Sequence, residues 1–297
     1  MEKLFKTLID DAIKLCATDI HFVPVPNQKT LIQMRMNGAN SFYKMNLDNT
    51  LYGKLLIYMK FISHLDVSER NKAQSGQLIY NNDSDFYLRI STLPISLGLE
   101  ACAIRLTPKD FTREQINEND MDFQNIRNKM FESEGLFLFT GPTGSGKSTL
   151  MYELLFALKR EQNKHIITIE DPVEQNLHGI VQVSVNEKAN ITYQQAFKAI
   201  LRCDPDVIMI GEIRDEITAN HVIQASLSGH LVLSTMHARN NIGAIYRLLE
   251  LGITREQIKQ GVSCIANQRL ITSKMGGRIR EMSYIFTEEI NKIEMSD

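Results

Sequence analysis

The chain has 297 residues, about twice the length of a typical single domain, so two domains are expected. Hydrophobic residues make up 43% of the chain and charged residues 23%, which is ordinary globular usage and excludes wholesale disorder. The 33 Lys and Arg residues are balanced by 35 Asp and Glu residues, and the net charge of −2 argues against a protein coated with basic groups for binding nucleic acid.

The cysteines and the apolar segments narrow the class of protein further. Cys16, Cys102, Cys203 and Cys264 lie too far apart in the sequence for a zinc ribbon or a dense disulfide framework, so reduced and buried thiols are expected. No apolar run approaches the ~20 residues that cross a bilayer, and the first residues lack the apolar segment of a signal peptide. The sequence therefore predicts a soluble cytoplasmic protein whose contact with a membrane is peripheral.

Residues 1–108 have the pattern of a mixed domain. Apolar residues recur at helical spacing over 4–16 and 47–63, which predicts two helices. The expected turns are Asn37-Gly38 and the polar run 81–85. Strands in runs joined by such hairpins indicate a small α+β domain with a mainly antiparallel sheet. The predicted strands span residues 20–25, 31–36, 76–80, 86–92 and 100–106.

The pattern changes after this domain. Residues 109–134 are polar and rich in charge, and we interpret them as an inter-domain linker that becomes helical near its end. Beyond the linker, over 135–297, almost continuous apolar runs alternate with helical patterns, which predicts a parallel sheet covered by helices on both faces. A capping box at 254–257 begins one more helix, and a turn at 275–277 precedes a last strand. The apolar runs span residues 135–140, 165–169, 207–210 and 230–235, and the helical patterns span 149–160, 192–203 and 215–227.

Residues 141–148 read Gly-Pro-Thr-Gly-Ser-Gly-Lys-Ser and match the P-loop pattern. Glycines let such a loop curl so that its backbone N–H groups converge on phosphate oxygens, and the following helix N-terminus favours negative charge. Lys147 is expected to reach the β- and γ-phosphates of ATP, and the Ser148 hydroxyl to ligate Mg²⁺. The alternative, a glycine turn without a ligand, is disfavoured because an apolar strand precedes the loop and a helical pattern follows it. The predicted ATP-binding residues of the loop are Gly141, Pro142, Thr143, Gly144, Ser145, Gly146, Lys147, Ser148 and Thr149.

Two acidic segments follow apolar strands further along the chain. Glu170 and Asp171 end one strand, and Glu212 follows another in a segment that resembles Walker B. Open α/β sheets bind ligands at the carboxyl ends of their strands, so these carboxylates are expected beside the triphosphate. We expect Glu212 to hold Mg²⁺, partly through water, or to orient the attacking water, and we favour a functional role for Glu170 as well. For Asp171 and Asp215, capping of the next helix is an equal alternative.

Two histidines flank the strand expected at 231–235. A lone histidine is more often a partly buried structural residue than a functional one, and this remains the alternative for His230. His237 follows the strand and is placed to touch a γ-phosphate or the water beside it. His165, His178 and His221 are interpreted as structural or surface residues.

Four segments in this order resemble the Walker A, Asp, Walker B and His boxes of the secretion and type IV pilus traffic ATPases. They are residues 141–149, Thr-Ile-Glu-Asp-Pro-Val-Glu at 168–174, the segment 201–215 that ends Gly-Glu-Ile-Arg-Asp, and Ser-Gly-His-Leu-Val-Leu-Ser-Thr-Met-His at 228–237. Residues 18–22 and 88–94 are similar to segments of the family's first domain. The resemblance implies an α/β protein, with a RecA-like P-loop domain preceded by a smaller α+β, PAS-like domain, and a Mg²⁺-dependent ATPase activity.

The resemblance also assigns roles to six residues. It implies that two carboxylates activate water and hold magnesium, that two histidines sense or position the γ-phosphate, and that two arginines of the first domain approach the nucleotide when the domains close. For the arginines, an ordinary surface position on a strand is an equal alternative. The residues are Glu170, Glu212, His230, His237, Arg89 and Arg105.

Members of this family act as hexameric rings at the cytoplasmic face of the membrane, with a polytopic platform protein as partner. Here only Cys264 follows the His box, so the family's four-cysteine zinc module is not expected, and the Asp-Ile-His segment at 19–21 leaves no room for an additional N-terminal domain. The chain therefore resembles the competence pseudopilus assembly ATPases (the ComGA type), which drive DNA uptake.

Two alternative functions stay open, and a third, direct binding of nucleic acid, is not expected. Pilus retraction ATPases are similarly short, and a nucleotide-gated binding module with little turnover is an alternative from another class. Direct contact with nucleic acid is not expected, because the charge is balanced and no basic stripe interleaved with aromatic residues is evident. The linker is the expected hinge between the domains.

Overall fold

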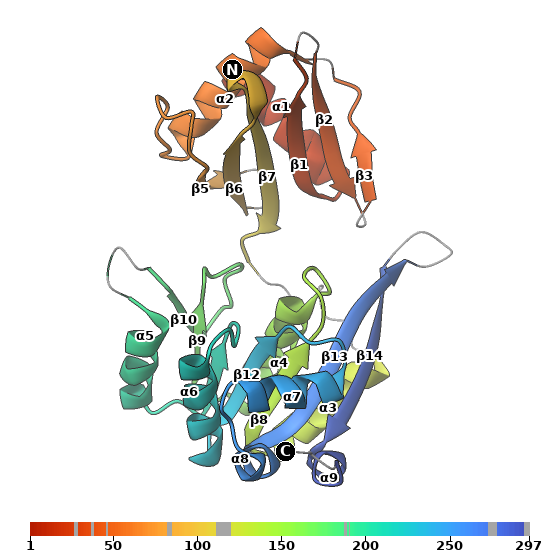
Figure 1. Ribbon diagram of the computed structural model, residues 1–297, viewed down its shortest axis with the longest axis vertical. Helices are drawn as coiled ribbons and strands as arrows, with labels where there is room; N and C mark the ends of the chain where they lie inside the picture. Colours follow the sequence, from red (N-terminus) through yellow and green to blue (C-terminus); the bar gives the residue numbers. More distant parts are fainter. Residues whose placement is uncertain are drawn as a thin grey trace. The chain divides into compact units, whose positions relative to one another are not determined.

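The computed structural model describes residues 1–26, 29–36, 39–45, 47–81, 85–110, 120–186, 189, 191–272 and 278–293. The chain divides into two compact units, Met1–Asp110 and Phe111–Asp297 (Figure 1). The turns expected at 37–38 and 275–277, and the middle of the turn at 81–85, lie outside the described residues, as does the stretch 111–119 of the expected linker.

The first unit is an antiparallel sheet with two helices packed on one face (Figure 1). Its strand order is β3-β2-β1-β7-β6-β5, and the short β4 pairs with β2. The antiparallel α+β domain expected from the sequence is confirmed. The elements are α1 (Glu2–Lys14), β1 (Ala17–Pro24), β2 (Lys29–Met36), β3 (Ala39–Phe42), β4 (Leu47–Asp48), α2 (Asn49–Ile62), β5 (Gln74–Asn81), β6 (Asp85–Pro94) and β7 (Glu100–Pro108).

Local sequence explains how the helices of this unit begin and end. Helix α1 buries its apolar stripe, including Leu8 and Ile9, against the sheet. It ends at Lys14, before the predicted limit, and Cys16 takes a left-handed φ of 52° in the turn that follows. Asp48 begins α2 as its N-cap, accepting a hydrogen bond from the Leu51 backbone N–H at 2.7 Å.

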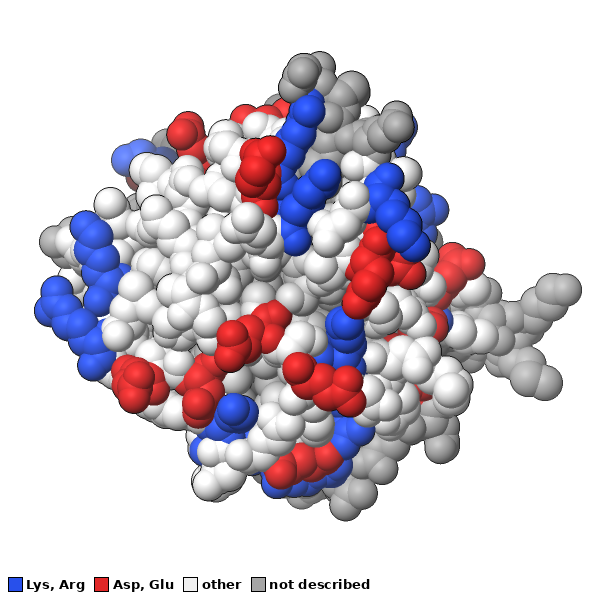
Figure 2. Space-filling model, turned by 90° about the horizontal axis from the view of Figure 1, so that it is seen from below, with Lys and Arg blue, Asp and Glu red and all other residues white. Residues whose placement is uncertain are grey.

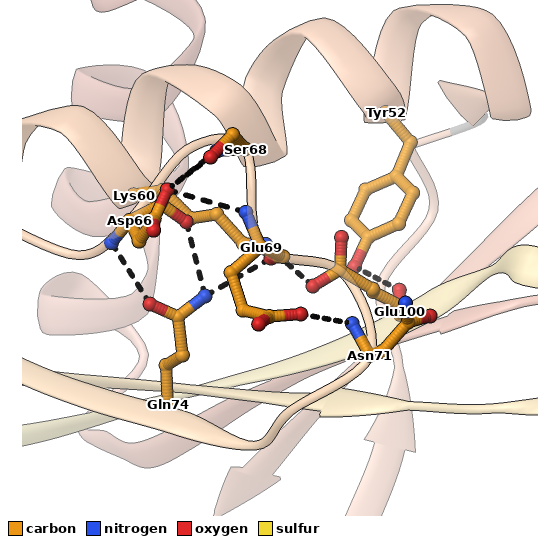
Figure 3. Close-up of polar contacts among 8 residues, drawn as sticks. All are labelled: Tyr52, Lys60, Asp66, Ser68, Glu69, Asn71, Gln74 and Glu100. Carbon is orange, nitrogen blue, oxygen red and sulfur yellow. Dashed lines mark hydrogen bonds and ion pairs between the residues drawn. The ribbon is translucent and has the colours of Figure 1, made fainter.

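A buried ion pair joins α2 to β7 (Figure 3). Lys60 Nζ lies 2.5 Å from Glu100 Oε1, and the two side chains are only 1% and 7% exposed. Lys60 also donates to the Glu69 carbonyl at 2.7 Å, and the Tyr52 hydroxyl donates to the Glu100 carbonyl at 2.8 Å. Because neither charge has access to bulk water, each depends on the other for its compensation.

The same region fixes the loop between α2 and β5 (Figure 3). Asp66 Oδ1 accepts from the Ser68 N–H and hydroxyl, and these hydrogen bonds, with one from the Glu69 N–H, lower the pKa of Asp66. The Gln74 amide accepts from the Asp66 N–H at 2.8 Å and donates to the Asp66 and Glu69 carbonyls. The loop is therefore held by side-chain hydrogen bonds as well as by Lys60.

The second unit is a sheet of order β10-β9-β11-β12-β8-β13-β14 between two layers of helices (Figure 1). Every neighbouring pair is parallel except β13 and β14, which form an antiparallel hairpin at one edge. Leu136 and Leu138 face the layer of α5 to α8, whereas Phe137 and Phe139 face α3 and α4. The predicted α/β architecture is thus confirmed, with the antiparallel edge strand as an addition.

The elements of this unit follow the predicted alternation closely. They are α3 (Met121–Glu132), β8 (Gly135–Thr140), α4 (Lys147–Gln162), β9 (Ile166–Glu170), β10 (Val181–Ser184), α5 (Tyr193–Ile200), β11 (Val207–Ile210), α6 (Glu216–Leu227), β12 (Leu231–Met236), α7 (Asn241–Glu250), α8 (Arg255–Gly261), β13 (Val262–Thr272), β14 (Arg278–Phe286) and α9 (Thr287–Ile290). The capping box predicted for α8 is present, with Thr254 and Gln257 bonded reciprocally.

The end of the expected linker differs from the prediction. Asp120 caps α3, and the helix buries Phe123, Ile126 and Met130 in the core shared with α4. Residues 120–132 therefore belong to the packed second unit, and the division between units lies at Asp110 and Phe111. The many polar residues of this amphipathic helix concealed its buried stripe in the sequence.

The structure also shows the burial of the cysteines and the length of the apolar helices among the described residues. All four cysteines are free, but only Cys102 and Cys264 are buried, whereas Cys16 and Cys203 are exposed in turns. The expectation of four buried thiols is therefore wrong for two of them. No helix among the described residues is long and apolar enough to cross a bilayer.

We predict that Lys60→Met destabilises the chain by about 3–5 kcal/mol, because it leaves the Glu100 carboxylate buried without its partner. The double variant Lys60→Met, Glu100→Leu is expected to recover most of that loss, since both charges are then removed. The measurement is urea unfolding of the full chain. The control is Lys72→Met, whose side chain is 80% exposed with its Nζ 3.8 Å from Glu69 Oε2, and which should change stability by less than about 1 kcal/mol. Equal stability of Lys60→Met and the control would contradict this account.

Candidate nucleotide-binding site

The P-loop connects β8 to α4 and depends on its glycines. Gly141, Gly144 and Gly146 have φ values of 141°, 75° and 87°, in the range that favours glycine. A Cβ atom at Gly141 would lie 2.3 Å from the Gln268 carbonyl oxygen, and one at Gly146 would lie 2.8 Å from Gln268 Nε2. The first and third glycines of the motif are therefore required both by backbone conformation and by the close approach of β13.

The remaining loop residues have the exposure that a ligand site requires. Pro142, Thr143 and Gly144 are exposed at the tip, and Ser145 is buried at the base. Ser148 is half-buried in the first turn of α4, and Thr149 beside it is exposed. The hydroxyl and backbone groups expected to meet phosphate thus lie where solvent and a ligand can reach them.

Lys147 is folded back onto the loop. Its Nζ donates to the Gly141 carbonyl at 2.9 Å and to the Pro142 carbonyl at 3.0 Å. Burial lowers the pKa of Lys147, and the nearby negative charge of Glu212 acts in the opposite direction. The lysine and the Walker B carboxylate therefore share one neighbourhood, as the sequence predicted.

Glu212 is the centre of a small charged cluster at the carboxyl ends of β11 and β12. Its Oε1 lies 3.2 Å from His237 Nε2, and its Oε2 lies 2.8 Å from Arg214 Nε. His237 Nδ1 lies 3.2 Å from the Gly141 carbonyl oxygen, which also accepts from Lys147. The P-loop, the Walker B segment and the second histidine of the His box thus form one continuous site.

Arg214 belongs to this cluster although the sequence did not single it out. The hydrogen bond and the charge of Glu212 raise the pKa of Arg214, and Arg214 Nη1 lies 3.7 Å from Asp171 Oδ2. The arginine therefore links the acidic segments that follow β9 and β11. Its place in the Gly-Glu-Ile-Arg-Asp segment was the only sequence signal for this role.

Glu170 lies in a buried layer beside the cluster and is only 4% exposed. Its carboxylate accepts hydrogen bonds from Thr168 Oγ1 at 2.5 Å, from Gln182 Nε2 at 3.1 Å and from the Tyr152 hydroxyl. Burial and the charge of Glu170 raise the pKa of Tyr152, so that the phenol stays protonated and donates. Glu170 therefore joins β9 to the P-loop helix, in a supporting position.

His230 does not join the site within this chain. It precedes β12, where its carbonyl accepts from the Gly135 N–H at 3.0 Å and its Nδ1 lies 3.0 Å from Ser228 Oγ. A six-residue strand, roughly 20 Å at ~3.3 Å per residue, separates it from His237. The expectation that His230 positions the γ-phosphate of this chain's own site is therefore corrected, because β12 runs parallel to β8 and only its carboxyl end lies beside the P-loop.

Two other polar residues have the structural roles that we considered. Asp215 caps α6, accepting from the Thr218 N–H at 2.8 Å. His221 stacks on Phe197 with ring centroids 4.6 Å apart, and burial lowers its pKa. Both residues are explained without a ligand.

The two predicted arginines are neighbours in the first unit. Arg89 and Arg105 occupy paired positions of β6 and β7, and both are exposed. Arg105 Nε lies 3.0 Å from Asp19 Oδ1, and Arg89 Nε donates to Ser75 Oγ at 3.2 Å. They form a compact cationic pair on the open face of that sheet, and their approach to nucleotide remains a prediction.

The residues present fit a nucleotide with magnesium rather than a metal centre made by protein alone. Among the described residues, no group of three or more His, Cys, Asp or Glu side chains could hold a metal ion. Ser148 and Glu212 together offer one hydroxyl and one carboxylate, a donor set that suits Mg²⁺ bound mainly by phosphate oxygens and water. The curled backbone of the loop, with positive φ at Gly141, Gly144 and Gly146, is the feature that suits the phosphates.

Comparison with known proteins decides the family. The model of the family "Type II/IV secretion system protein" matches residues 1–288. The chain belongs to this family. It is 41% identical over 280 residues to competence protein ComGA of Bacillus subtilis (strain 168), covering 91% of this chain and 76% of that protein. It is also 37% identical over 274 residues to the type II secretion system ATPase E of Vibrio cholerae serotype O1, covering 91% of this chain and 54% of that longer protein.

Solved structures of similar fold support the same conclusion. The pilus retraction motor PilT with bound ADP is 27% identical, with a TM-score of 0.72 over 96% of this chain and 85% of that chain. The ATPase DotB of Legionella pneumophila has a TM-score of 0.79 over 97% of this chain and 82% of that chain, at 21% identity, which shows the fold alone. The predicted family and fold class are confirmed.

We predict that Tyr152→Phe destabilises the second unit by about 1.5–3 kcal/mol, because the buried Glu170 carboxylate loses a hydrogen-bond donor. The measurement is urea unfolding of the full chain at neutral pH. The matched control is Tyr284→Phe, which removes a hydroxyl that accepts from Asn125 Nδ2 at an exposed position. If the two variants lose equal stability, Glu170 does not depend on Tyr152.

Proposed function

We propose that this chain is a Mg²⁺-dependent ATPase that powers assembly of a type IV pilus-like competence pseudopilus for DNA uptake. One observation supports the activity above all others: Lys147 and His237 both contact the Gly141 carbonyl of the P-loop, and His237 also contacts Glu212. The 41% identity with ComGA supports the competence role.

The first step is the exchange of partners at Lys147. The ammonium group leaves the Gly141 and Pro142 carbonyls and binds the β- and γ-phosphates, while the backbone N–H groups of the loop and the start of α4 bind phosphate oxygens. Ser148 and Glu212 would hold the magnesium ion, which when bound neutralises charge on the phosphates. Lys147 would thereby exchange contacts within the loop for contacts with the substrate.

Glu212 then has a hydrolytic role. A carboxylate between His237 and Arg214 is oriented on both oxygens, so it can accept a proton from, or align, the water that attacks the γ-phosphate. His237 lies between the P-loop carbonyl and Glu212, where it would respond to the state of the terminal phosphate. Glu170 supports the neighbouring strand end from its buried position.

The first unit would complete the site. We propose that Arg89 and Arg105 approach the nucleotide when the units close and neutralise charge that develops on the transferred phosphoryl group. Helix α3 packs in the second unit and would move with it. Binding energy that differs between open and closed arrangements then converts hydrolysis into motion.

The proposed assembly and location follow from the family. The chain forms a hexameric homo-oligomer at the inner face of the cell membrane, held there by a polytopic platform protein of the pilus machine. Direct binding of DNA is not part of the proposal. On the face drawn in Figure 2, acidic and basic side chains are interspersed, and the described residues there form no continuous basic stripe.

Two alternatives have specific support. The likeness to PilT at 27% identity favours a retraction motor as the second candidate. A nucleotide-gated binding module with little turnover is the third candidate. It is favoured by the contacts of Glu212, because in this conformation each carboxylate oxygen already has a partner, His237 or Arg214.

We predict that Lys147→Ala abolishes nucleotide binding and ATPase activity, whereas Glu212→Gln leaves nucleotide affinity within about threefold and lowers kcat by about 100-fold or more. Turnover is measured as phosphate release with Mg²⁺, and affinity by titration with a fluorescent nucleotide. Lys164→Ala and Glu250→Gln, two exposed positions away from the P-loop, are the controls. Wild-type turnover in the Lys147 variant would remove the assignment of the loop, and tight binding without turnover in wild type would favour the gated module.

Assembly and retraction predict different phenotypes in the source cells. If the chain drives assembly, Glu212→Gln introduced at the native locus abolishes both surface filaments and uptake of labelled DNA. A retraction motor would instead leave filaments in place, or lengthen them, while uptake is lost. Electron microscopy of sheared surface fractions together with transformation frequency distinguishes the two outcomes.

A further inference from the structure

Gln268 is a buried polar residue that the sequence did not mark. It lies in β13, more than a hundred residues after the P-loop, and is 1% exposed. Its Nε2 donates to the Ser145 carbonyl at 2.6 Å. The assignment of the amide is fixed by chemistry, since a carbonyl oxygen can only accept and the opposite orientation would set two oxygens against each other.

The amide oxygen of Gln268, unlike its amide nitrogen, makes no hydrogen bond to a described residue. This Oε1 atom is buried, and Ser145 Oγ beside it is likewise buried without a hydrogen-bond partner among the described residues. An unpaired buried acceptor costs free energy, so stability alone would favour an apolar side chain of similar volume, such as Met or Leu, at this position. Gln268 leaves its Oε1 without a partner, while its Nε2 donates to the P-loop. This arrangement therefore indicates a functional reason for the glutamine.

The backbone explains what this hydrogen bond does. The Ser145 carbonyl and the Gly146 N–H belong to one planar trans peptide, so the two groups point in opposite directions. Holding the carbonyl toward β13 turns the Gly146 N–H away from β13. Gln268 lies close to both glycines that flank the loop, since a Cβ atom at Gly141 would meet its carbonyl oxygen and one at Gly146 would meet its amide nitrogen.

We propose that Gln268 is a positioning residue that sets the conformation of the P-loop and aims the Gly146 N–H at a nucleotide phosphate. This inference rests on the proposed function and adds a residue to its binding site. Gln268 touches no reacting atom and acts through the Ser145–Gly146 peptide. In this conformation two side chains donate hydrogen bonds to carbonyls of the loop. Lys147 donates to those of Gly141 and Pro142, and Gln268 donates to that of Ser145.

Two substitutions separate this role from simple packing. Gln268→Met keeps the volume but removes the donor, and we expect it to weaken binding of a fluorescent ADP by about tenfold or more at every pH. Gln268→Glu keeps the shape, and its carboxyl group can donate to Ser145 only while it is protonated. Burial raises the pKa of such a carboxyl group, so the donor is present at low pH and is lost as pH rises through that raised pKa.

The experiment is a titration of the full chain with fluorescent ADP between pH 6 and pH 9, with each affinity divided by that of wild type at the same pH. Division by wild type removes every pH effect that the ligand and the unchanged part of the site have in common in all variants. We expect Gln268→Glu to bind almost as well as wild type at pH 6 and progressively worse toward pH 9, while Gln268→Met stays weak throughout.

The control is Gln257→Met, which removes a glutamine hydrogen bond of the same unit, in the capping box of α8, without touching the P-loop. It should lose stability but not affinity. A Gln268→Met protein that binds within twofold of wild type overturns the proposal, as does a Gln268→Glu protein whose relative affinity does not change with pH. Wild-type protein that binds no nucleotide would overturn the proposed function as well. The pH series within Gln268→Glu keeps the test decisive even if Gln268→Met fails to fold.

Discussion

The carbonyl oxygen of Gly141 accepts a hydrogen bond from Lys147 at 2.9 Å and lies 3.2 Å from His237 Nδ1. His237 in turn lies 3.2 Å from Glu212, so one backbone group connects the P-loop lysine to the Walker B carboxylate. A phosphate that draws Lys147 away changes the partners of that carbonyl, and through His237 it changes the surroundings of Glu212. In the function that we propose, the state of the nucleotide and the orientation of the Glu212 carboxylate are therefore coupled through these contacts.

This coupling requires that the strand ends and the helix keep their positions, and buried polar groups supply much of that rigidity. Tyr152 of α4 holds Glu170 at the end of β9, and Gln268 of β13 holds the base of the P-loop. Arg280 of β14 pairs with Glu153 of α4 at 2.7 and 2.8 Å, and burial raises the pKa of Glu153 while Arg280 opposes that change. Polar contacts therefore hold the P-loop helix α4 to β9 on one side of β8 and to β14 on the other, in addition to its apolar core.

Two of the interpretations that the structure corrected, the linker and His230, failed for reasons visible in the fold. Residues 120–132 look like a linker because polar side chains outnumber the three that become buried, Phe123, Ile126 and Met130. His230 and His237 both adjoin β12 and look equivalent in the sequence. Strand direction separates them, because β12 runs parallel to β8 and only residues after its carboxyl end meet the P-loop. That rule was available from the sequence and would have removed His230.

The sequence by itself determined the parallel sheet, the antiparallel first unit, the P-loop and the placement of Glu212 and His237. These features follow from local patterns, namely apolar periodicity and the spacing of glycine, lysine and acidic residues at strand ends. Only the tertiary structure identified Arg214 as a link between the acidic segments, Tyr152 as the partner of Glu170, and Gln268 as the partner of Ser145. Such pairs depend on how strands and helices distant in the chain are aligned, and a side chain that finds its partner across a sheet leaves no periodic or local signal in the sequence.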